Sequence, residues 1–229
     1  MIIKFNRPLS DFDVLVMFDL ASKNTGVCAY DLKKRKVLWT DMVRVKDGEE
    51  LPAAALEEEL ELFFKKRDLD NGRILFSMEA MPTQLRGGSS TVQTFIALAR
   101  SHAVLDVFLY KRNACVYDYT GVYPATTHAL FKEIKGLGRD DKVTKDDVKK
   151  YLLGAGVIKD FSVTLDESDA VFLCYGLLMK KWNNDISEQI RELKRHKKTL
   201  KLSKRISEVD AEIERLKNLM IKKEEMPDV

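Results

Sequence analysis

The stretch Val14-Leu15-Val16-Met17-Phe18-Asp19-Leu20-Ala21-Ser22-Lys23-Asn24-Thr25-Gly26 decides how this chain folds. Its first five residues form a continuous apolar run, which predicts a strand buried on both faces. The run ends in Asp19, so a carboxylate stands at the edge of a packed element. A second acidic cluster, Asp166-Glu167-Ser168-Asp169-Ala170, follows about 150 residues later.

The segments after Gly26 predict a mixed α/β sheet. Residues 27–30 and 37–39, joined by a basic turn, have the pattern of an antiparallel hairpin. Pro52 begins a helical pattern with an apolar face. The remaining elements are expected to be a buried strand over 73–78, a helix over 89–111 and a strand over 114–119. We therefore expect an α/β fold with a mixed five-stranded sheet flanked by helices.

Two carboxylates end buried strands of this sheet. Asp19 follows the first strand and Glu79 follows the strand over 73–78. Removing a carboxylate from water costs several kcal/mol unless it is solvated, paired or bound to a cation. Two such strands side by side would hold both carboxylates within reach of one cation. The alternative is that each residue caps the turn after its strand.

The second acidic cluster precedes an apolar helix over 170–179. Asp166 and Asp169 are three residues apart, so they share a face of the first helical turn and repel each other unless a cation or the helix dipole compensates. Capping by Asp166, with Glu167 complementing the dipole, is the structural alternative. Together with Asp19 and Glu79, the pair indicates a metal-dependent site that cleaves phosphodiesters.

Composition limits the class of protein. The chain has 229 residues, 45% of them hydrophobic, and a formal net charge of +3, so it can bury one substantial core and carry an extension. Cys28, Cys115 and Cys174 stand far apart, which is typical of reduced thiols in a cytoplasmic protein. Charge interrupts the apolar runs before the roughly 18 residues of a membrane span. We therefore expect a soluble, cytoplasmic protein without a membrane partner.

The C-terminal part differs in charge and pattern. Residues 180–205 carry a local balance of +7, and no Gly or Pro occurs from 183 to 225. The apolar spacing changes register near 197–205, which predicts either a helical hairpin or one long helix with different partners. We expect a main domain over 1–182 and a basic helical extension over 183–229. The extension would contact duplex phosphates, pack on the core or dimerise.

Four motifs, taken in order, resemble the RuvC-type Holliday junction resolvases of the RNase H-like superfamily. They are Asp19 with Gly26 seven residues later, the strand-end Glu79, the stretch Gly136-Leu137-Gly138-Arg139-Asp140-Asp141-Lys142, and the closing Asp166-x-x-Asp169-Ala170. The likeness runs from about residue 13 to residue 181, at close to the family's spacing.

The resemblance implies an RNase H-like fold and a nuclease acting on four-way junctions and other branched DNA. Asp19, Glu79, Asp166 and Asp169 would be the metal ligands. Hard oxygen ligands favour Mg²⁺, with Mn²⁺ as a substitute, and two ions roughly 4 Å apart would serve an in-line displacement. The expected product is a nick with a 5′ phosphate.

A lysine near the scissile phosphate would offset charge in the transition state. Counting from the glycine motif selects Lys142, which we prefer, whereas counting back from the apolar positions over 148–153 selects Lys145. Further candidates for contact with DNA are Lys23, Arg86, Lys132, Arg139 and Lys145.

The loop after Glu79 departs from the family, whose bacterial members carry an aromatic wedge there. Met81 or Leu85 would serve as an apolar wedge, and Gly87-Gly88 predicts looser selectivity that extends to forks. The likeness also implies a homodimer, for which we expect the helix over 89–111 to supply the contact through Phe95, Leu98, His102, Leu105 and Leu109. A phage-encoded member would act in the host cytoplasm.

Two other classes remain as alternatives. An ATP-binding protein of the sugar-kinase and actin superfamily shares the sheet, but it needs a second phosphate loop, and no second Asp-Gly-rich turn follows a strand here. A non-catalytic protein that binds branched DNA is the other alternative, and the presence of all four carboxylates argues against it.

Overall fold

The computed structural model describes residues 11–21, 23–45, 52–70, 73–81, 92–117, 122, 124–138, 140–160, 162–199 and 203–220. Its centre is a five-stranded sheet of order β3-β2-β1-β4-β5. The strands are β1 (Val14–Asp19), β2 (Asn24–Asp31), β3 (Lys36–Arg44), β4 (Ile74–Met78) and β5 (Cys115–Val116). Strands β1, β2 and β3 pair antiparallel, whereas β4 is parallel to both β1 and β5. The predicted α/β fold, a mixed five-stranded sheet flanked by helices, is thus confirmed.

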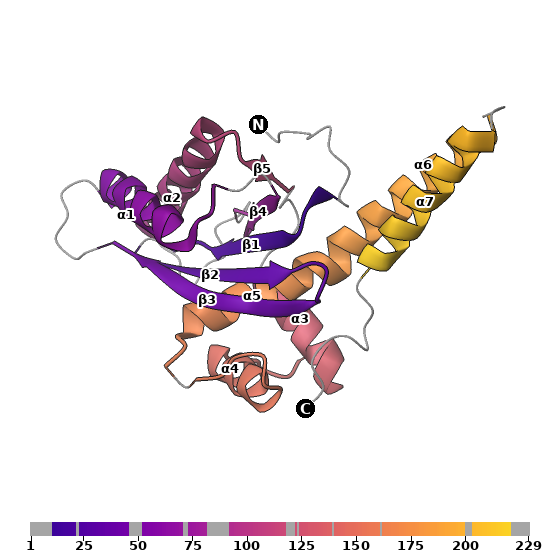
Figure 1. The fold of residues 1–229 in the computed structure, drawn as a ribbon. Coiled ribbons are helices and arrows are strands. Elements are labelled where there is room, and N and C mark those ends of the chain that lie inside the picture. Colours follow the sequence, from indigo (N-terminus) through magenta and orange to yellow (C-terminus); the bar gives the residue numbers. More distant parts are fainter. Residues whose placement is uncertain are drawn as a thin grey trace.

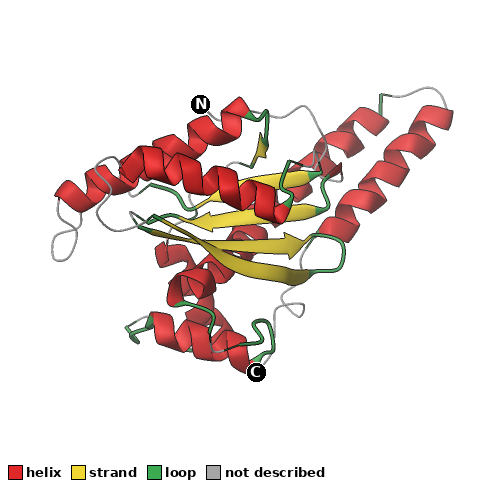
Figure 2. Cartoon of the chain, turned by 60° about the vertical axis from the view of Figure 1, so that its left-hand side comes forward, coloured by secondary structure: helices red, strands yellow, loops and turns green. Residues whose placement is uncertain are grey.

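Helices cover both faces of the sheet (Figures 1 and 2). One face carries α1 (Pro52–Arg67) and α2 (Val92–Lys111), and the other carries α3 (Pro124–Lys135), α4 (Lys145–Gly154) and α5 (Leu165–Leu177). Strand β1 shows why both faces are buried. Leu15 and Met17 pack into the core that contains α5, whereas Val16 and Phe18 pack into the core under α1 and α2, as the two-residue period of a strand requires.

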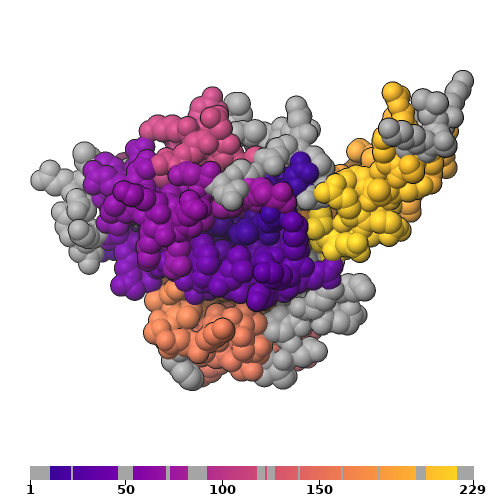
Figure 3. Space-filling model, in the orientation of Figure 1, coloured from indigo at the N-terminus to yellow at the C-terminus, as the bar shows by residue number. Residues whose placement is uncertain are grey.

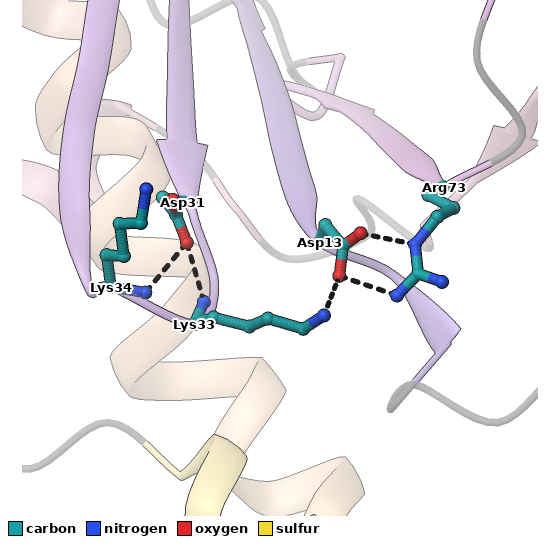
Figure 4. A network of polar contacts seen from close by, with 5 residues as sticks. All are labelled: Asp13, Asp31, Lys33, Lys34 and Arg73. Atoms are coloured by element: carbon teal, nitrogen blue, oxygen red, sulfur yellow. Dashed lines mark hydrogen bonds and ion pairs between the residues drawn. The ribbon is translucent and has the colours of Figure 1, made fainter.

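Polar contacts hold the start of β1 between its neighbours (Figure 4). Asp13 forms ion pairs with Arg73, which precedes β4, and with Lys33 of the β2–β3 turn. The hydrogen bond with Arg73 lowers the pKa of Asp13 to about 2. In the turn itself, the Asp31 carboxylate accepts the backbone N–H groups of Lys33 and Lys34. These contacts hold β1, β2 and β4 in register at the end of the sheet that lies opposite to Asp19 and Glu79.

Helix α2 shows where one sequence interpretation was wrong. Part of the stripe predicted to form a dimer contact is buried inside this chain: His102, Leu105 and Leu109 lie in the core. They are turned inward because α2 packs on α1 and the sheet. The helix is long and apolar enough to cross a membrane by length and composition alone, and its packing in the core accounts for part of that apolar character.

The C-terminal helices form a hairpin, one of the two predicted arrangements. Helix α5 continues through the π-helical turn η2 (Leu178–Trp182) into α6 (Asn183–Lys197), and α7 (Ser203–Leu219) returns beside α6. The predicted domain boundary at 182/183 falls within this helical run. Trp182 is fully buried, and its indole N–H donates to the Leu219 carbonyl at 3.0 Å. The base of the hairpin is therefore part of the main core.

All three cysteines are free, and Cys28 and Cys174 are buried. The expectation of unpaired core thiols is confirmed for these two residues, while Cys115 is only partly buried.

Candidate active site

Sheet register brings Asp19 and Glu79 together. In the parallel pair β1–β4, Phe18 lies opposite Met78, so the next residue of each strand is one of the two carboxylates. The backbone N–H of Glu79 donates to the Phe18 carbonyl at 3.1 Å. The negative charge of Glu79 is among the causes that raise the pKa of Asp19, so the two side chains lie close together. The predicted pairing of these residues is therefore present.

The first turn of α5 supplies the other two carboxylates. Thr164 caps the helix, because its hydroxyl accepts the Glu167 N–H while the Glu167 carboxylate accepts the Thr164 N–H. This reciprocal cap satisfies the helix start without Asp166 or Asp169. The alternative assignment of Asp166 as the cap was wrong, since Thr164 fills that position. The side chains of Asp166 and Asp169 are therefore not used for capping and are available to the site.

Gly26 allows α5 to approach Asp19. It lies in β2 directly opposite Asp19. A Cβ at this position would stand 2.1 Å from the carbonyl oxygen and 2.5 Å from the carbonyl carbon of Asp166. Such distances cannot exist, so the missing side chain of Gly26 is what lets the backbone of α5 touch the sheet here. The Asp19–Gly26 spacing noted in the sequence has this physical cause.

Lys145 is the cation at this cluster. The first residue of α4, it places its Nζ 2.6 Å from Asp169 and 3.1 Å from Asp166. Thr144 and Asp147 cap α4 reciprocally and so fix where the helix begins. Lys142 is exposed and lines a separate hollow with Phe131, Lys150 and Tyr151. Of the two lysines that the sequence offered, the geometry favours Lys145.

The carboxylates perturb one another strongly. Burial, together with the charges of Glu79 and Asp169, raises the pKa of Asp19 well above its ordinary value. Burial raises the pKa of Glu79 to about 7. Burial also raises the pKa of Asp169, although its ion pair with Lys145 opposes the shift. The pKa of Lys145 is raised because this ion pair outweighs the effect of burial. The site therefore has an excess of negative charge that one lysine does not balance.

The donor set fits a hard divalent cation. Four carboxylates supply oxygen ligands only, and an ammonium group already bridges two of them. Within the described ranges, no group of three or more His, Cys, Asp or Glu side chains stands ready to hold a metal ion. A bound cation would offset the negative charge that Lys145 alone does not balance.

The other predicted DNA contacts are dispersed or lie outside the described residues. Lys23 is exposed just before β2, and Lys132 is partly exposed in the last turn of α3. Arg86 and Arg139 fall outside the described residues, as do Leu85, Gly87 and Gly88. Met81, the other candidate wedge, is partly exposed two residues beyond Glu79.

Sequence reasoning missed one residue near the cluster. His128 lies on α3, and its positive charge lowers the pKa of Asp169. Helix α3 was not predicted, although Pro124 stands at its first position, as Pro52 does in α1. Proline at the first helical residue was the available signal.

Comparisons with known proteins give solved structures only; no protein-family model and no curated protein matches the chain. Thermus thermophilus RuvC in complex with a Holliday junction substrate is 12% identical, with 71% of this chain and 91% of that chain covered and a TM-score of 0.49. A second structure of T. thermophilus RuvC is 14% identical, with 71% and 92% covered and a TM-score of 0.48. The yeast mitochondrial Holliday junction resolvase Ydc2 is 16% identical, with 71% and 76% covered and a TM-score of 0.39.

Proposed function

We propose that this protein is a metal-dependent, structure-selective endodeoxyribonuclease that nicks Holliday junctions and other branched DNA. One observation carries the proposal: Asp19, Glu79 and Asp169 come from three separate elements, yet each has a raised pKa caused by burial and by neighbouring negative charge. Such an arrangement costs folding free energy, and perturbed carboxylates of this kind are concentrated at functional sites. The four sequence motifs supply the reaction class.

Each side chain has a role that follows from its position. Asp19, Glu79, Asp166 and Asp169 would hold Mg²⁺, or Mn²⁺ as a substitute, in one or two sites. When bound, the metal would activate the attacking water and stabilise the leaving oxygen. Lys145, ion-paired with Asp166 and Asp169, is placed to donate to a phosphate oxygen and so to offset charge in the transition state.

The direct test is cleavage of end-labelled DNA by the purified chain. Four-way junction, fork and linear duplex are each incubated with Mg²⁺ or with EDTA. Paired nicks in branched substrates, dependent on Mg²⁺ and carrying 5′ phosphates, are the expected result. Binding without cleavage would favour the non-catalytic alternative, and the absence of binding would refute the proposal.

We also propose a homodimer formed through the outer face of α2. Exposed apolar side chains are concentrated there, namely Val92, Ile96, Val107 and Tyr110. A two-fold pair would present two sites to a near-symmetric junction. Sedimentation of the wild-type chain and of Ile96→Lys tests this proposal, because the variant should shift to the monomer while its circular dichroism spectrum shows an unchanged fold.

A further inference from the structure

The hairpin of α6 and α7, called the arm from here on, extends well beyond the body of the molecule (Figures 1 and 3). Its base is fixed by the Trp182–Leu219 hydrogen bond and by Arg35, which donates to the Asn218 carbonyl at 2.6 Å. Tyr117 adds a hydrogen bond to Asp185 at 2.6 Å. The arm therefore leaves the body in a defined direction, and the residues near its tip have a fixed position relative to the body.

Four cations share one face of α6 near that tip. Arg191, Lys194, Arg195 and Lys198 are all exposed, and their spacing of three, four and seven residues puts them in one stripe. We call these residues the basic stripe. The buried positions Ile186 and Ile190 lie on another side of the helix. Lys194 and Arg195 lie in the last turn of α6, where the helix dipole favours cations, but like charges three and four residues apart repel one another, so the stripe as a whole does not stabilise the helix.

Three other cations of the arm are neutralised, unlike the stripe. Lys197 pairs with Asp210 at 2.6 Å, Arg215 with Glu212 at 3.2 Å and Lys217 with Glu214 at 2.5 Å. Among the described residues, no member of the basic stripe has an acidic partner. Glu188 and Glu192 are also exposed on this helix, so the four cations of the stripe leave a net excess of positive charge facing solvent.

We propose that the basic stripe binds the phosphate backbone of a DNA duplex arm, at a distance from the cleavage site. This inference rests on the proposed function. The stripe is about 10 Å long at 1.5 Å per residue, which matches about three phosphates of one strand. A protein partner would need an apolar anchor, and none of the large exposed hydrophobic side chains of the described residues lies on α6 or α7.

The continuous helical run from α5 to α6 sets the distance between the carboxylates and the basic stripe. Asp166 stands at the start of α5 and Arg195 near the end of α6, with η2 joining the two helices. At 1.5 Å per residue these positions are roughly 45 Å apart, or about 13 base pairs of B-DNA. The start of α5 and the end of α6 lie at opposite ends of this run (Figure 1). A duplex arm shorter than about 13 base pairs cannot occupy both places.

The length of the duplex arms of a junction therefore distinguishes DNA contacts made by the basic stripe from contacts made near the carboxylates. The variant R191Q/K194Q/R195Q/K198Q removes the stripe, and R215Q/K217Q removes two cations from the same hairpin as a matched control. Binding is measured in EDTA on four-way junctions with arms of about 8 or about 25 base pairs, chosen on either side of the 13-base-pair limit. Compared with the wild-type chain, the stripe variant should bind junctions with long duplex arms at least ten-fold more weakly. It should bind junctions with short duplex arms equally well. For junctions with long duplex arms, the slope of log K against log salt concentration should fall in magnitude by about 3, because three phosphate contacts are lost.

Each other outcome overturns the inference. Equal binding of long-armed junctions by the wild type and the stripe variant would contradict it. Equal losses of affinity for long-armed and short-armed junctions would also contradict it, because they would indicate damage to the fold. A hydroxyl-radical footprint of the wild-type chain needs no variant, and it should show protection of about three nucleotides at least about 13 base pairs from the cut. If the wild type neither binds nor cuts junctions, the proposed function fails with the inference. If it does both without distal protection, only the inference fails.

Discussion

Substituting Gly26 with alanine tests how the sheet positions helix α5. The added Cβ would lie 2.1 Å from the Asp166 carbonyl oxygen and 3.0 Å from the Glu167 nitrogen, both of them backbone atoms. Ordinary contact begins at 3.4 Å, so β2 and the start of α5 must separate by about 1.3 Å near Asp166, enough to misplace a reacting group. Asp166 and Asp169 would move away from Asp19 and Glu79 together.

The expected loss is large in activity and moderate in stability. A misplacement of about 1 Å can cost on the order of 100-fold in rate, and inserting a methyl group into a packed contact costs about 1–3 kcal/mol. Single-turnover cleavage of a four-way junction at saturating protein should therefore fall about 100-fold. The unfolding temperature should fall by roughly 2–12 °C for a chain of this size. Junction binding in EDTA should change little.

Gly176→Ala is the matched control because Gly176 lies in the same helix. There the added Cβ would meet the Thr127 side chain at 3.5 Å, which is ordinary contact. Alanine favours a helix over glycine by about 1 kcal/mol, so this variant should keep its activity and unfold at the same or a slightly higher temperature. If Gly26→Ala cleaves within a few-fold of wild type with an unshifted unfolding temperature, the close approach of α5 to β2 is not what positions the site.

Three further predictions concern the charges of the site. Asp19→Asn or Asp169→Asn should abolish cleavage and preserve or tighten junction binding, because each removes a negative charge that faces phosphate; normal nicking by either variant would contradict the assignment. Lys145→Gln should slow single-turnover cleavage by about 100-fold, the scale of losing one charge-stabilising donor, whereas Lys142→Gln should stay near wild type, and the reverse order would restore Lys142 as the catalytic lysine. Burial raises the pKa of Glu79 from 4.5 to about 7, so the folded metal-free protein holds a proton that the unfolded chain releases. The free energy of unfolding in EDTA should therefore fall as the pH rises from about 4.5 to about 7, and Glu79→Gln should flatten that fall in urea titrations; an unchanged slope would count against the buried carboxyl.

Much of the fold was predictable because local pattern and tertiary context agree. The apolar run of β1 is too long and continuous for a half-exposed strand, and Pro52 stands at the first position of α1. The hairpin of β2 and β3 forms where the basic turn predicted it. The break in apolar register before α7 likewise marked the end of α6.

Helix α2 shows where pattern was insufficient. It has apolar residues on more than one side, and a periodic stripe does not reveal whether it faces the chain's own sheet or a second molecule. Leu105 and Leu109 are fully buried, whereas Val107 and Tyr110 are more than half exposed. The predicted dimer stripe thus included residues that the chain uses for its own core, and only the packing of α2 beside α1 separates the two sets.

The four carboxylates were predictable for a reason that does not extend to the lysine. Asp19 and Glu79 are placed by the register of two parallel strands, and Asp166 and Asp169 by the period of one helix. A carboxylate at the end of an apolar run and a pair three residues apart in a first helical turn are local regularities that a sequence displays, and the family resemblance is what predicted that all four meet. Lys145 is placed by where α4 begins, and that depends on the Thr144 cap and on the path of the chain after the glycine motif. Counting from either side of an irregular segment gives different answers, so the cation at the site had to come from the structure.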